Sequence, residues 1–161
     1  PRRLSELLVY GLNALQLRRK DFEVLFFGDR NLPAAPTFPH KILKVLPSKK
    51  LGKLYRACDL GCVFSGTNYS LIPIEMMACG LPVVEFDGEN VSSTFPPGTF
   101  APAKPDPQGI AEVLDELLSD REKRKKHSIE ALKFVSSLSW ETSARAVEKA
   151  LLDTALKGNE G

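Results

Sequence analysis

The sequence predicts an α/β fold in which helices pack on the faces of a parallel β-sheet. Short apolar runs typical of buried strands occur at residues 22–29, 41–46, 60–65 and 81–86. Segments with helical spacing stand before, between and after these runs. Right-handed crossovers between such strands place the loops that follow them along one edge of the sheet.

Helical signals account for much of the remaining chain. An N-terminal helix presents one apolar face, formed by Leu4, Leu7, Leu8, Leu12 and Leu15. Ser48 is expected to cap a second helix that runs through Tyr55. Three more helices are expected near the C-terminus. The first starts at Asp106-Pro107 and has an inner stripe of Ile110, Val113, Leu114, Leu117 and Leu118. The second has Leu132, Val135 and Leu138 inside, and the third is capped by Ser139.

The segment between the last strand and Asp106 looks different. Residues 87–107 are polar and proline-rich, and we predict a long loop there, of the kind that often has a function. Phe95 and Phe100 within it are expected to pack on the core, because isolated aromatic residues usually do. Residues 157–161 are predicted to form a frayed tail.

Composition indicates one domain over residues 1–161. A net charge of +2 argues against a nucleic-acid binder, and the basic run at 121–127 is interpreted as a solvated helix face. No apolar run is long enough to span a bilayer. The cysteines are odd in number and are expected in the core as Cys58, Cys62 and Cys79. Free cysteines of this kind fit a cytoplasmic location.

The stretch from Ser65 to Phe86 carries most of the functional signal. Its polar start follows a strand, where ligands bind in open parallel sheets. The helix that follows would offer free N–H groups to a diphosphate, with Pro73 in its first turn and Gly80 at its end. Glu75 lies about one turn after the start of this helix, and its carboxylate can accept hydrogen bonds from ribose hydroxyls. On the chemistry of these residues alone, an ordinary loop and a surface glutamate are a slightly better explanation.

A resemblance favours the first interpretation. The segment "YRACDLGCVFSGTNYSLIPIEMMACGLPVVEFDG" resembles the C-terminal donor-binding domain of the retaining GT-B glycosyltransferases known as group 1, with "IEMMACGLPVVEF" the most specific part. "FEVLFFGD" and the C-terminal "SW" helix resemble further family segments. The resemblance implies a Rossmann-like domain, one half of a GT-B enzyme, cut from a longer chain whose N-terminal acceptor domain is absent.

The resemblance also implies roles for individual residues. Glu75 is the second acid of the family's E-x7-E motif and would hold the nucleotide ribose, while Leu46, Pro47 and Gly28 would lie near the nucleoside. Arg2 and Arg3 fall near the family's basic residues that neutralise the diphosphate. The donor sugar and diphosphate would be lined by Gly66, Thr67, Asn68, Tyr69, Ser70 and Leu71.

The sequence departs from the family at the first acid of that motif, where Thr67 stands. This acid contacts the donor sugar in the family, so a usual hexose donor is in doubt, and the pattern is similar to bacterial rhamnosyltransferases of surface polysaccharides. A deoxysugar such as that of dTDP-rhamnose has fewer polar groups to satisfy, which a neutral threonine suits.

We therefore expect a glycosyltransferase domain that binds a nucleoside diphosphate sugar and needs no cofactor or metal, since no D-x-D cluster is present. Its expected partners are the N-terminal domain of the same enzyme and a glycan acceptor, with room for peripheral membrane association of the full-length enzyme. The isolated fragment should be inactive. Two alternatives stay open: a degenerate, non-catalytic interaction module and a GT-B nucleotide-sugar epimerase.

Overall fold

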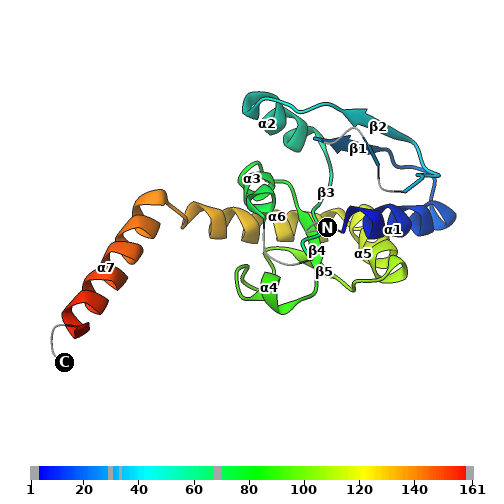
Figure 1. Ribbon diagram of the computed structural model, residues 1–161. Helices are drawn as coiled ribbons and strands as arrows, with labels where there is room; N and C mark the ends of the chain where they lie inside the picture. Colours follow the sequence, from blue (N-terminus) through cyan, green and yellow to red (C-terminus); the bar gives the residue numbers. More distant parts are fainter. Residues whose placement is uncertain (1–3, 29–30, 33, 67–69, 159–161) are drawn as a thin grey trace.

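The computed structural model describes residues 4–28, 31–32, 34–66 and 70–158. Its elements follow one another as strands and helices in the predicted alternation (Figure 1). They are α1 (Ser5–Arg18), β1 (Val24–Phe27), β2 (His40–Leu43), α2 (Ser48–Ala57), β3 (Gly61–Cys62), α3 (Leu71–Ala78), β4 (Val83–Phe86), α4 (Glu89–Ser92), β5 (Ala101–Ala103), α5 (Pro107–Ser119), α6 (Arg121–Ser136) and α7 (Trp140–Gly158).

The strands are parallel, as predicted, but the described strands form two sheets instead of one. In the first, β1 pairs with β2, and Val24 lies opposite His40. The second has the order β3-β4-β5. A cavity of about 520 Å³, lined largely by apolar side chains of both sheets, α1 and α5, lies between them. The prediction of one sheet is wrong because apolar runs identify strands without specifying which edges pair.

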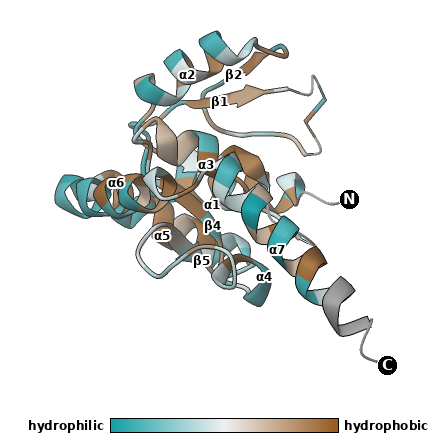
Figure 2. Ribbon diagram, turned by 90° about the vertical axis from the view of Figure 1, so that its left-hand side faces the viewer, coloured by the Kyte–Doolittle hydropathy of each residue, from teal (hydrophilic) through white to brown (hydrophobic). Residues whose placement is uncertain are grey.

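Helices cover both faces of the β3-β4-β5 sheet, which confirms the predicted layering. Val84 and Phe86 of β4 point toward the core formed with α1 and α5. Val83 points to the other face, into a core with Met76 and Met77 of α3. Successive strand residues face opposite sides, so β4 is buried along its whole length. Figure 2 shows hydrophobic residues along this central strand and hydrophilic residues over much of α6.

Helix α1 lies directly against α5. The buried residues of α1 are Val9, Gly11, Leu12 and Leu15, and Leu4, Leu7 and Leu8 pack against them at the edge of the core. A Cβ at Gly11 would lie 2.4 Å from Cγ2 of Ile110, so only glycine lets the two helices approach this closely. Ile110, Leu114 and Leu117 are buried, which confirms the inner stripe predicted for α5.

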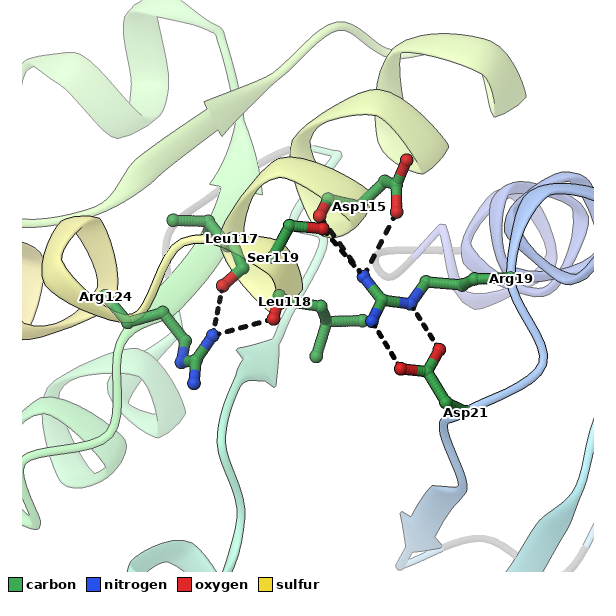
Figure 3. A network of polar contacts seen from close by, with 7 residues as sticks. All are labelled: Arg19, Asp21, Asp115, Leu117, Leu118, Ser119 and Arg124. Atoms are coloured by element: carbon green, nitrogen blue, oxygen red, sulfur yellow. Dashed lines mark hydrogen bonds and ion pairs between the residues drawn. The ribbon is translucent and has the colours of Figure 1, made fainter.

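A polar network joins the end of α1 to α5 (Figure 3). The Arg19 guanidinium donates two hydrogen bonds of 2.7 Å to Asp21, and its Nη1 donates to Asp115 Oδ1 and Ser119 Oγ at 3.1 Å each. Arg124 of α6 donates to the backbone carbonyls of Leu117 and Leu118 at the C-terminal end of α5. Arg124, which belongs to the basic run at 121–127, therefore joins α6 to α5, so this run is not only a solvated helix face.

The predicted helix starts are confirmed where side-chain caps define them. Asp106 Oδ1 accepts from the Gly109 N–H at 2.8 Å, and Pro107 is the first residue of α5. Ser139 Oγ accepts from the Thr142 N–H at 3.0 Å at the start of α7. Helix α2 has Tyr55 buried, but the predicted cap by Ser48 is wrong: Ser48 is the first helical residue, Pro47 holds the N-cap position, and no described side chain caps the helix.

Residues 87–107 differ from the predicted loop. They contain α4 and β5, and β5 pairs with β4 so that Pro102 lies opposite Glu85. A strand with a central proline is difficult to predict, but β5 has no described strand on its far side, where a missing N–H costs little. Phe95 and Phe100 are core residues, as expected, with ring centroids 6.1 Å apart.

The C-terminal predictions are partly wrong. Leu132 and Leu138 were expected inside but are 38% and 45% exposed. The helix α7 continues through Gly158, into the predicted tail, and extends away from the body (Figure 1). The three cysteines are free and half-buried, less enclosed than expected. In the described part of the chain, every helix is too short or too polar to span a bilayer.

Candidate nucleotide-sugar site

The loop between β3 and α3 starts at the carboxyl edge of the sheet, as the sequence predicts. Ser65 is buried, and Gly66 and Leu71 are exposed. Ser70 caps α3, because its Oγ accepts from the Ile72 N–H at 3.3 Å. Thr67, Asn68 and Tyr69, which complete the predicted lining, lie outside the described residues.

A buried carboxylate holds the first residue of this loop. Glu85 of β4 is 1% exposed, and its Oε1 accepts from the backbone N–H groups of Ser65 at 2.9 Å and Phe86 at 3.0 Å. Its Oε2 accepts from Ser65 Oγ at 3.3 Å. Asn90 of α4 donates to the Ser65 carbonyl at 3.2 Å. Ser65 is thus bonded through its amide, its hydroxyl and its carbonyl.

The charge of Glu85 is costly in this position. Burial raises the pKa of its carboxyl above the ordinary value, and the hydrogen bonds from Phe86 and Ser65 oppose that rise. The thiol of Cys62 also has a raised pKa, about 12, because of burial first and the nearby charge of Glu85 second. Glu85 therefore serves as a hydrogen-bond acceptor that organises the loop.

Helix α3 has the predicted local features. Pro73 is buried in its first turns, and Gly80 beyond its end has a φ of 77°, the left-handed value that glycine adopts readily. Ser128 of α6 donates to the Gly80 carbonyl at 2.7 Å, which fixes this end of the helix. Glu75 is exposed on α3, so its carboxylate is accessible to a ligand.

Tyr55 connects Glu75 to the first sheet. Its ring packs edge-to-face on Phe27 at the end of β1, with centroids 5.8 Å apart. Burial first, and the nearby charge of Glu75 second, raise the pKa of its phenol to about 12. Gly28 follows Phe27 with a φ of 101°, and, apart from its chain neighbours, no described residue has an atom within 4 Å of where its Cβ would be. Gly28 therefore directly follows the residue that packs on the Tyr55 ring, and Glu75 lies near the Tyr55 hydroxyl.

Leu46 and Pro47 occupy the other end of α2. Leu46 is half-buried and Pro47 is exposed, directly before the helix begins. At a rise of about 1.5 Å per residue, Pro47 lies roughly 12 Å along α2 from Tyr55. Leu46 and Pro47 therefore lie at the opposite end of α2 from Tyr55.

Arg2 and Arg3 lie outside the described residues. The next residue, Leu4, donates its backbone N–H to the Phe64 carbonyl at 3.2 Å. Phe64 directly precedes Ser65 and stacks on Phe86 with centroids 4.2 Å apart. The described start of the chain is therefore attached next to the β3–α3 loop.

Sequence reasoning missed the parts of this site that depend on tertiary contacts. Glu85 interrupts the apolar run "LPVVEF", and a carboxylate in a buried strand was a usable signal. Asn90 gave no signal, because it lay in the predicted loop. Among the described residues, no group of three histidine, cysteine or acidic side chains is arranged to hold a metal ion.

Comparisons with known proteins identify the family and the fold of the chain. The family model "Glycosyl transferases group 1" matches residues 39–134, more than half of the chain. The O-antigen biosynthesis protein RfbC of Myxococcus xanthus is 37% identical over 114 residues, which cover 70% of this chain and 9% of RfbC.

Solved structures with the same fold are distant in sequence. Sucrose-phosphate synthase from Thermosynechococcus elongatus has a TM-score of 0.70 at 19% identity, over 94% of this chain and 42% of that one. Anabaena HepE, solved in complex with UDP, has a TM-score of 0.59 at 16% identity, over 91% of this chain and 55% of that one. The chain spans about half or less of each of these relatives, and its fold is that of one half of a GT-B glycosyltransferase.

Proposed function

Because this chain belongs to the glycosyl transferases group 1 family, we propose that it is the donor-binding domain of a retaining glycosyltransferase. It would bind a nucleoside diphosphate sugar, from which the enzyme transfers the sugar to a glycan acceptor. The observation that carries the proposal is the β3–α3 loop, pinned by Glu85 and followed by a capped helix start, at the edge where parallel sheets bind ligands. HepE, which has a similar fold, is solved in complex with UDP, and this supports a nucleotide as the ligand class.

Each part of the site has a proposed role. The backbone at the start of α3, where the Ile72 N–H is already capped by Ser70, would bind the diphosphate together with Gly66, and Glu75 would bind the ribose. Thr67, Asn68, Tyr69, Ser70 and Leu71 would line the donor sugar, and Gly28, Leu46 and Pro47 the nucleoside. Arg2 and Arg3 would neutralise the diphosphate as negative charge develops on the leaving group, a role supported by the attachment of Leu4 beside the loop.

The proposed sugar is a deoxyhexose carried on dTDP, of which dTDP-rhamnose is an example. Thr67 stands eight positions before Glu75, where an acid would contact a hexose hydroxyl, and a neutral side chain there suits a sugar with one hydroxyl fewer. The similarity to an O-antigen biosynthesis protein supports a role in polysaccharide synthesis. We place this activity in the bacterial cytoplasm, where free cysteines persist.

Catalysis would require more than this chain. The proposed partners are an N-terminal domain of the same enzyme, which would supply the acceptor site, and the glycan acceptor itself. The 161 residues alone should bind the donor weakly and transfer no sugar. No metal or other cofactor is part of the proposal.

Ligand-detected NMR with UDP, GDP, dTDP and dTDP-rhamnose tests the proposal. We expect one nucleotide to bind, and Glu75→Ala to weaken it. Glu141→Ala, which changes an exposed carboxylate on the projecting helix α7, should leave binding unchanged. Absence of binding at millimolar concentration, in this chain and in the full-length protein, would favour the non-catalytic interaction module instead.

A further inference from the structure

Among the described residues, the buried hydroxyl of Tyr55 makes no hydrogen bond of normal geometry, although the Glu75 carboxylate lies near it. Tyr55 is 3% exposed, and no described atom lies in hydrogen-bonding geometry around its Oη. Buried hydroxyls in native proteins nearly always have a partner, so an unsatisfied one indicates a missing acceptor. Its ring is fixed by the edge-to-face contact with Phe27, which limits where the hydroxyl can point.

The neighbouring helix supplies a suitable acceptor. Helices α2 and α3 pack together here, and Arg56, which follows Tyr55, has its Nη1 3.8 Å from Cys79 Sγ. The Glu75 carboxylate of α3 is close enough for its charge to act on the Tyr55 phenol. Glu75 is exposed, so its side chain can adopt several rotamers and needs a restraint to present one oxygen to a ligand.

We propose that Tyr55 is a positioning residue that donates its hydroxyl hydrogen bond to Glu75 when the ribose of a nucleoside diphosphate is bound. One carboxylate oxygen would accept from Tyr55, and the other would be left to accept from a ribose hydroxyl. The inference rests on the proposed function, since it concerns how the same site recognises its nucleotide. Phe27, the last residue of β1, would hold the Tyr55 ring in place beside Glu75.

The substitution Tyr55→Phe tests the inference cleanly, because it removes one oxygen and keeps the ring. In the full-length protein, isothermal titration with UDP, GDP and dTDP should show affinity for the preferred nucleotide about tenfold weaker in this variant, as expected for a lost hydrogen bond to a charged group. Thermal unfolding should be unchanged or occur at a higher temperature, because an unsatisfied buried hydroxyl has been removed.

Tyr10→Phe is the matched control. Tyr10 of α1 also pairs with a carboxylate, donating to Glu6 Oε1 at 2.8 Å, but on an exposed helix face. Its removal should leave nucleotide affinity unchanged.

A double-mutant cycle separates positioning from packing. In the Glu75→Ala background, Tyr55→Phe should cause no further loss of affinity, because the acceptor is already absent. A tenfold loss in that background as well, or an unchanged affinity of the single variant, would overturn the inference and leave the proposed function standing. A wild-type protein that binds none of the three nucleotides would overturn the proposed function and the inference with it.

Discussion

Replacement of Glu85 tests how the loop that starts the candidate site is held. In Glu85→Ala, the buried N–H groups of Ser65 and Phe86 lose their acceptor, and each unsatisfied donor costs about 1–3 kcal/mol. Removal of the buried charge offsets part of this loss, so we expect a net destabilisation of about 2–4 kcal/mol. Glu85→Gln keeps Oε1 for both N–H groups, and its amide can donate to Ser65 Oγ, so its stability at pH 7 should stay within about 1 kcal/mol of wild type.

The pH dependence gives the same test a second readout. The folded pKa of Glu85 lies above the ordinary value of 4.5, so between the two values the folded protein retains a proton that the unfolded chain has lost. The contribution of Glu85 to stability therefore decreases as pH rises through that window, and Glu85→Gln should remove this decrease. Urea unfolding of the wild type and both variants from pH 4 to 8 measures these effects. Equal destabilisation by alanine and glutamine would refute the assigned role of the Oε1 hydrogen bonds.

Further predictions concern packing and helix starts. Gly11→Ala should lower stability by about 1–3 kcal/mol, because its Cβ would overlap Ile110, whereas Gly52→Ala on α2 meets only ordinary contacts and should raise stability by up to about 1 kcal/mol. Chemical denaturation of the pair checks this, and a stabilised Gly11 variant would contradict the close approach of α1 and α5. Asp106→Ala should cost about 1 kcal/mol through the lost cap on the Gly109 N–H, and an unchanged unfolding midpoint would show that the cap contributes nothing.

Local features of the fold were predictable from sequence because neighbouring residues determine them. The helix start at Ser70, the end at Gly80 and the cap at Asp106 each depend on contacts within a few residues, and all are confirmed. The strand β5 was not predictable in the same way. Its three residues centre on Pro102, and only pairing with β4 makes them a strand.

Features that depend on tertiary contacts could not be predicted with the same success. The separation of β1-β2 from β3-β4-β5 depends on edge pairing, which apolar runs do not encode. Glu85 and Asn90 become site residues only because folding brings their elements to Ser65. Glu75 could be selected from its motif, but its proximity to Tyr55 depends on the packing of α2 against α3.

The central claim is that the carboxyl edge of β3, with the start of α3, binds a nucleoside diphosphate sugar. Amide chemical-shift mapping of the isotope-labelled chain during titration with dTDP-rhamnose, dTDP, UDP and GDP tests it most directly. We expect saturable shifts for at least one ligand at Gly66, Ser70, Leu71 and Glu75, and none along α7. Shifts confined to other surfaces, or no saturable shifts with any of the four in this chain and the full-length protein, would contradict it.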